Sequence, residues 1–103
     1  MDLIVDSRDQ KFVLYELLQI QDLLKTEKYG DFDQEMFDMT LELTKQICEE
    51  HVLGCYGEVD SEGGAKFENG KVTIPKQYHN VHKVMNEAGL FSMAISAESG
   101  GQG

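Results

Sequence analysis

Apolar residues recur at helical spacing near the start of the chain. They stand at i, i+4, i+7 and i+11, which is the spacing of one face of an α-helix. Ser7 and Gln10 stand three residues apart just before this run, as in a capping box. The pattern therefore predicts a helix over about residues 7–25. Its apolar stripe consists of Val13, Leu17, Ile20 and Leu24.

A second apolar pattern predicts a helix over about residues 33–53. Two neighbouring apolar rows cover more than half of its circumference. Asp31 or Asp33 is expected to cap its start, and Gly54 is expected to end it. The rows are Met36, Thr40, Leu43 and Ile47, and then Phe37, Leu41, Cys48 and Val52.

Residues 54–74 are rich in glycine and are expected to be mostly non-helical. Asn69-Gly70 lies between two strand-like runs and predicts a β-hairpin with a type I′ turn. Pro75 is expected at the first position of a third helix, which runs over about residues 75–88 and ends at Gly89. The predicted fold is all-α: a bundle of three or more helices, with a long glycine-rich loop and a short hairpin between the second and third helices.

Composition and charge narrow the function classes. The chain has 103 residues, enough for one small domain, and 41% of them are apolar. Nine basic and 19 acidic residues give a net charge of −10, which argues against binding to nucleic acid or to an anionic membrane. No secretion signal, transit peptide or membrane-spanning run is present, so we expect a cytoplasmic protein. Cys48 and Cys55 are expected to be free thiols.

Three motifs partly match known kinds of chemical site. Residues 58–63 resemble the opening of a calcium loop, but position one is Glu58 and the twelfth position is Asn69. His79 and His82 are three residues apart and lack the spacing of a helical zinc motif, and His51 is expected to be a hydrogen-bonded, partly buried side chain. Cys48 lies three residues before His51 without an evident third group. We therefore predict no metal site and no catalytic residue.

A set of short motifs after the second predicted helix carries a family resemblance. The motifs are Asp60-x-Glu62-Gly63, Asn69-Gly70-x-Val72-x-x-Pro75, Tyr78, Ala88-Gly89-Leu90 and Glu98-x-Gly100-Gly101-Gln102-Gly103. Their order and spacing resemble the N-terminal region of the FAD-dependent acyl-CoA dehydrogenases, and are most similar to a bacterial subgroup with an extra leading helix. Family members often have Trp near Leu90-Phe91, whereas this chain has none.

The resemblance implies that residues 1–103 are a single, incomplete helical N-terminal domain. In this family the flavin lies mainly on a following β-domain, and the catalytic base lies in a C-terminal helical domain. The parent enzyme would use FAD, an acyl-CoA substrate and an electron acceptor for α,β-dehydrogenation, whereas this fragment would bind no FAD and be inactive. By resemblance, the vicinity of the substrate pocket includes Glu98, Gly100, Gly101, Gln102 and Gly103.

Two further expectations follow from the residues themselves. A stand-alone acidic helical module that binds a partner helix is the alternative function. In both cases the predicted apolar faces are wider than a three-helix arrangement can cover, so we expect a homo-oligomer.

Overall fold

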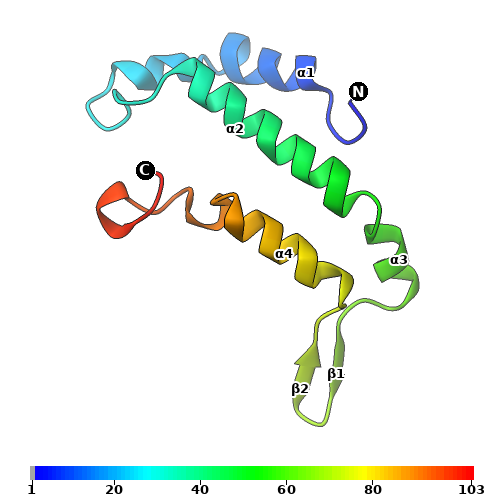
Figure 1. Ribbon diagram of the computed structural model, residues 1–103. Helices are drawn as coiled ribbons and strands as arrows, with labels where there is room; N and C mark the ends of the chain where they lie inside the picture. The colour runs from blue at the N-terminus through cyan, green and yellow to red at the C-terminus, as the bar shows by residue number, and fades with distance from the viewer. Residues whose placement is uncertain (1) are drawn as a thin grey trace. The chain divides into compact units, whose positions relative to one another are not determined.

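The computed structural model describes residues 2–103, and most of its elements are helical (Figure 1). This confirms the predicted helical character and the small β-hairpin. The chain divides into two compact units, described separately below: an N-terminal unit that ends at Gln46 and a C-terminal unit, Ile47–Gly103. In chain order the elements are α1 (Ser7–Lys11), the π-helix η1 (Phe12–Leu17), the 3₁₀-helix η2 (Ile20–Lys25), α2 (Gln34–Ile47), the π-helix η3 (Cys48–Val52), α3 (Tyr56–Ser61), β1 (Lys66–Glu68), β2 (Lys71–Thr73), α4 (Gln77–Glu87) and the 3₁₀-helices η4 (Leu90–Ser92) and η5 (Ala97–Ser99).

The predicted leading helix over 7–25 is divided into α1, η1 and η2. Gln19 separates η1 from η2, because its φ of 51° lies in the left-handed region, which does not continue a right-handed helix. Just before this break the backbone widens, and Leu18 N–H donates to the Val13 carbonyl, five residues back. The apolar spacing thus predicted the extent of this helical segment but not its interruption.

The start of α1 also differs from the predicted capping box. Asp6, not Ser7, is the N-cap, and its carboxylate accepts a hydrogen bond from Asp9 N–H at 3.1 Å. The Ser7 hydroxyl instead donates to the Asp2 carboxylate at 2.8 Å. The Ser7 hydroxyl is therefore bound to a residue that precedes it in the chain. The capping-box spacing concerns only the residues after Ser7 and could not predict this contact.

The second predicted helix begins where the sequence indicated. Asp33 caps α2, accepting a hydrogen bond from Met36 N–H at 2.8 Å. Helical residues continue through Val52, close to the predicted end. Gly54, however, does not adopt the left-handed conformation expected of a terminating glycine. Helix α3 then begins at Tyr56, inside the stretch that was expected to be mostly non-helical.

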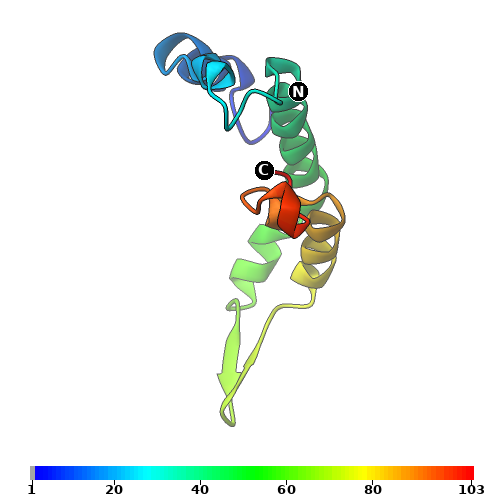
Figure 2. The same cartoon turned by 90° about the vertical axis from the view of Figure 1, so that its left-hand side faces the viewer.

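The β-hairpin of the C-terminal unit confirms its prediction. Strands β1 and β2 are antiparallel, with Phe67 opposite Val72. Asn69 and Gly70 both have positive φ, 52° and 75°, as a type I′ turn requires. Figures 1 and 2 show the hairpin extending away from α3 and α4.

Helix α4 confirms the third predicted helix, with shorter bounds at its start. It begins at Gln77, so Pro75 lies two residues before the first helical position instead of occupying it. Gly89 follows the helix with a φ of 77°, the left-handed conformation expected of a terminating glycine. The next residues turn through η4 and η5, and the alternating apolar residues 91–95 form no strand.

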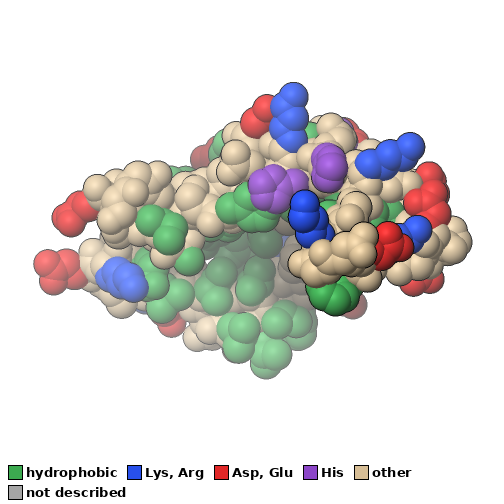
Figure 3. Space-filling view, turned by 90° about the horizontal axis from the view of Figure 1, so that it is seen from below, with side chains coloured by type: hydrophobic (Ala, Val, Ile, Leu, Met, Phe, Trp, Pro, Cys, Tyr) green, Lys and Arg blue, Asp and Glu red, His purple; other side chains and the backbone are tan. Residues whose placement is uncertain are grey.

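The buried core is small. Only Ile47, Val59 and Val81 are buried among the described residues, and all three belong to the C-terminal unit, where α4 packs against η3. In the N-terminal unit, two polar contacts join the leading segment to α2 in antiparallel order, Asp2 with Lys45 and Tyr15 with Asp38. Many large apolar side chains remain exposed, and Figure 3 shows hydrophobic groups at the molecular surface.

Candidate functional site

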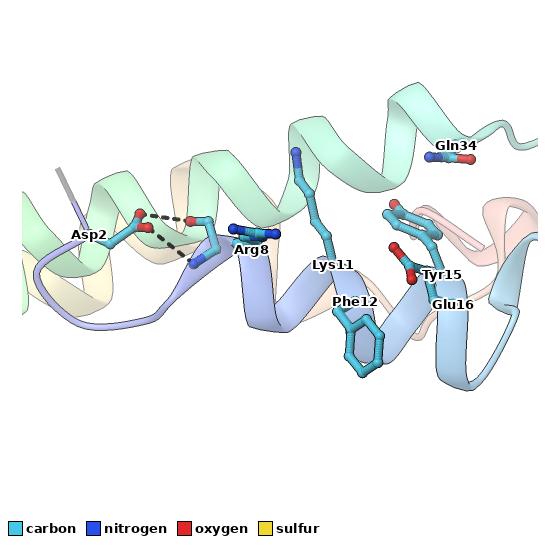
Figure 4. Close-up of a pocket in the computed structure, with 8 residues that line it drawn as sticks. Asp2, Arg8, Lys11, Phe12, Tyr15, Glu16 and Gln34 are labelled. Atoms are coloured by element: carbon cyan, nitrogen blue, oxygen red, sulfur yellow. Dashed lines mark hydrogen bonds between the residues drawn. The ribbon is translucent and has the colours of Figure 1, made fainter.

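The N-terminal unit contains an open pocket of about 860 Å³. Its walls combine basic, acidic and aromatic side chains from α1, η1 and the start of α2 (Figure 4). The lining residues are Asp2, Ser7, Arg8, Lys11, Phe12, Tyr15, Glu16 and Gln34. The pattern of apolar and polar residues along the chain does not predict this pocket.

Asp2 lines the pocket and is held in place by several polar contacts. Its carboxylate pairs with the Lys45 ammonium group and accepts hydrogen bonds from the hydroxyl and the backbone N–H of Ser7. The Lys45 contact, followed by those from Ser7, lowers the pKa of Asp2 to about 2. Asp2 therefore stays ionised at neutral pH and holds the residues before α1 against α2.

Tyr15 forms a second polar anchor. Its hydroxyl donates to the Asp38 carboxylate at 2.6 Å, and its backbone carbonyl accepts a hydrogen bond from the Gln21 side chain at 3.0 Å. Partial burial, together with the negative charge of Asp38, raises the pKa of Tyr15 to about 12. The phenol therefore remains protonated at neutral pH and acts as a structural donor, not as a general base.

Arg8 and Lys11 supply positive charge to the pocket. Within residues 2–103, neither side chain lies within ion-pair distance of a carboxylate. Figure 4 shows that Lys11 and Tyr15 extend toward the same side of the helical segment, whereas Phe12 extends toward the opposite side. Two cations near a phenol can attract an anionic group, but Asp2 and Glu16 in the same walls oppose a net positive potential. In the sequence, the placement of these two cations in one pocket is indicated only by their spacing of three residues.

The residues predicted by resemblance to lie near a substrate pocket come together in one C-terminal turn. Glu98 lies in η5, and Gly100 has a φ of 88°. A Cβ on Gly101 would lie 2.0 Å from the Ile95 carbonyl oxygen, so the position has no room for a side chain. The Gln102 amide donates to the Gly89 carbonyl at 2.7 Å, and Gly103 N–H donates to the Ile95 carbonyl at 2.9 Å.

An acidic cluster lies on α3, where the calcium-loop pattern begins. Glu58 and Asp60 lie within the helix and Glu62 directly follows it, so the start of this pattern does not wrap around an ion as a calcium loop does. The side-chain amide of Gln77 instead donates to Glu58 at 2.9 Å and to Glu62 at 3.0 Å, and thereby joins α4 to the α3 region. Glu62 and Gln77 also line a smaller pocket of about 320 Å³ beside Pro75.

The histidines and cysteines mostly make local packing and hydrogen-bond contacts. As predicted, His51 is partly buried and hydrogen-bonded, with its Nδ1 atom 3.3 Å from the Asn80 amide. The His82 ring packs against Phe91 at 4.9 Å between centroids. Both cysteines are free, and the Cys55 thiol donates to the His51 carbonyl. Within residues 2–103, His, Cys, Asp and Glu side chains nowhere gather in a group of three that could hold a metal ion.

Comparison with known proteins yields no relative. The chain matches no protein-family model, no curated protein and no solved structure. None of the helices within residues 2–103 combines the length and apolar character needed to cross a membrane.

Proposed function

We propose that this chain is the N-terminal helical region of a cytoplasmic FAD-dependent acyl-CoA dehydrogenase, inactive by itself. In the complete enzyme it would contribute part of the wall of the acyl pocket, next to the turn formed by residues 98–103. The reaction of that enzyme is the α,β-dehydrogenation of an acyl-CoA thioester. The ordered motifs after the second helix are the basis of this proposal.

One contact supports the proposal most directly. The motifs Ala88-Gly89-Leu90 and Gly100-Gly101-Gln102-Gly103 are separate in the sequence, yet the Gln102 amide donates to the Gly89 carbonyl at 2.7 Å. The close approach of Gly101 to Ile95 explains why a glycine is needed within this turn. The glycines of these two motifs therefore serve one local structure, as expected if the motifs form a functional unit.

The same turn is not suited to hold the flavin cofactor. A phosphate cradle needs several backbone N–H groups that point outward together. Here the N–H groups of Gly101, Gln102 and Gly103 donate to carbonyls within the same segment, those of Ser96, Ser92 and Ile95. We therefore propose that FAD is held by parts of the enzyme outside this turn, as the family resemblance implies.

The complete reading frame that contains this chain provides the test. We expect the complete protein to carry about one FAD per subunit and to dehydrogenate an acyl-CoA in a dye-linked assay. The 103-residue chain, purified in parallel, should show no flavin absorbance and no activity. A reading frame that stops after Gly103, or a complete protein without flavin, would overturn the proposal. Flavin bound to the short chain would contradict the location assigned to the cofactor.

The exposure of apolar side chains favours a second candidate, an acidic module that binds a partner helix. Leu17 is 66% exposed, and Leu18 and Met39 are similarly exposed, in a chain of net charge −10. Such side chains can bind an apolar helix while the acidic surface selects a basic partner. The same reading-frame experiment separates the candidates, because only a stand-alone module is encoded without the flavin-binding and catalytic domains.

A further inference from the structure

The β-hairpin presents an apolar face that no other part of its unit covers. Phe67 and Val72 are directly opposite each other, so their side chains share one face of the hairpin. Phe67 is 73% exposed and Val72 is 63% exposed, and Ile74 just beyond the hairpin is also exposed. Figures 1 and 2 show the hairpin standing away from α3 and α4, which belong to the same unit.

A hairpin of this size gains little stability by itself. Its two strands have three residues each, and a two-stranded hairpin in water is at best marginally stable. Its turn is well formed, but covering the pair of Phe67 and Val72 would add the burial that the hairpin lacks. These properties suit a segment that binds to another surface.

The charge of the hairpin segment indicates the charge of the surface that it would bind. Residues 66–76 contain Lys66, Lys71 and Lys76 against Glu68 alone, a net charge of +2. The rest of the chain has six basic and 18 acidic residues, a net charge of −12. A positively charged apolar segment on a strongly acidic protein is complementary to a second copy of the same protein.

Helix α2 offers a matching surface. Met36, Met39 and Leu43 are exposed and follow one another at helical spacing, so they form an apolar row along α2. Glu35 and Glu42 are also exposed, and they lie seven residues apart beside this row. The α2 row thus offers apolar contact area, and the two glutamates beside it offer carboxylates. The hairpin would require both features of its partner.

We propose that two copies of the chain associate through this pair of surfaces. The face formed by Phe67 and Val72 in one copy packs on the α2 row of the other copy. Lysine side chains have long flexible stems, so Lys66 and Lys71 reach carboxylates at the edge of the contact. This inference does not depend on the proposed flavoenzyme function, since it concerns surfaces of this chain alone.

Sedimentation velocity of the 103-residue chain tests the proposal. A hairpin on a helix is a small interface, so we expect reversible association within about 5–500 µM. Val72→Thr keeps the side-chain shape and strand propensity but places a hydroxyl in the contact, so the dissociation constant should rise at least about tenfold. Ile4→Thr is the matched control, because Ile4 is exposed outside both surfaces, and it should change the constant less than about twofold.

A charge exchange identifies the two surfaces directly. Lys66→Glu alone and Glu42→Lys alone should each weaken self-association, whereas an equimolar mixture of the two variants should associate more strongly than either variant alone. Lys66 pairs across the hairpin with Thr73, so reversing its charge removes no cross-strand ion pair. Recovery in the mixture also shows that both variants are folded.

Three results would overturn the proposal. The first is a wild-type chain that stays monomeric up to about 500 µM. The second is equal weakening by Val72→Thr and Ile4→Thr, which would mean that apolar exposure in general, and not the hairpin, drives association. The third is a mixture of the charge variants that associates no better than each variant alone, which would assign the hairpin to a different partner.

Discussion

At the scale of single residues, polar contacts join the leading segment to α2. Asp2 contacts Lys45, and Tyr15 contacts Asp38, while no described residue of the N-terminal unit is buried. In a unit with so little burial, each hydrogen bond contributes a larger share of the small net stability than it would in a well-packed domain.

We expect Tyr15→Phe to lower the free energy of unfolding by about 1 kcal/mol, because it removes the hydrogen bond to Asp38. Urea unfolding followed by circular dichroism measures this change. Tyr29→Phe is the matched control in the same unit, since Tyr29 packs its ring against Phe32 and its hydroxyl has no hydrogen-bond partner within residues 2–103. An equal effect of the two substitutions would contradict the role assigned to Tyr15.

The same contact predicts a pH dependence. The pKa of Tyr15 is raised from 10.0 to about 12 in the folded chain, so the native state retains this proton longer than the unfolded state does. The stabilisation is therefore complete below pH 10 and is lost as the pH rises toward 12. The difference between the wild type and Tyr15→Phe should shrink over this range, and a difference that is constant with pH would argue against the contact.

At the scale of elements, glycines define the C-terminal turn. Gly89 and Gly100 adopt left-handed conformations, whereas Gly101 is needed because the Ile95 backbone lies too close for a Cβ. The sequence showed a concentration of glycines here but did not distinguish these roles, because each role depends on which backbone atoms come near.

Gly101→Ala should destabilise the C-terminal unit by about 1–3 kcal/mol, because the Ile95 backbone must move to admit the methyl group. Hydrogen exchange at the amides of Gln102 and Gly103 gives a local measure, and it should become faster. Gly54→Ala is the control, since no atom lies within 4 Å of its Cβ position, and it should be neutral or stabilising. Unchanged exchange in Gly101→Ala would contradict this account of the turn.

The elements also differ in how far the sequence predicted them. The hairpin and the Gly89 helix end were correct because Asn-Gly and a terminal glycine impose their backbone angles locally. The break at Gln19 was missed, since glutamine has no intrinsic preference for a positive φ, and the side-chain contact of Gln21 with Tyr15 beside this break depends on the fold. Helix α3 was missed because its single buried residue, Val59, creates no periodic pattern.

At the scale of the whole molecule, burial is limited to a few residues. Among residues 2–103, the buried set consists of Ile47, Val59 and Val81, and all of them lie in the C-terminal unit. In the apolar rows recognised in the sequence, most members are half-buried. Four remain exposed and are available to bind other surfaces: Val13, Leu17, Met36 and Leu43.

Because the core is small, each buried side chain contributes a large share of the free energy of unfolding. Val59→Ala should lower the free energy of unfolding of the C-terminal unit by roughly 2 kcal/mol, because it removes two buried methyl groups. Val13→Ala, in another helical segment and at a side chain that is 41% exposed, should have a smaller effect. Urea unfolding measures both, and an equal loss in the two variants would show that Val59 is not part of a packed core.

The sequence by itself determined the helical character, the hairpin with its turn and the glycine that ends α4, and it narrowed the cap of α2 to Asp31 or Asp33, of which the structure shows Asp33. These features depend on backbone preferences and on neighbours a few residues away. Only the tertiary structure decided which contacts form between distant residues: Tyr15 with Asp38, Gln77 with Glu58 and Glu62, and Gln102 with Gly89. It also decided which apolar faces stay exposed, because burial depends on what packs against a face and the periodicity of a chain does not contain that information.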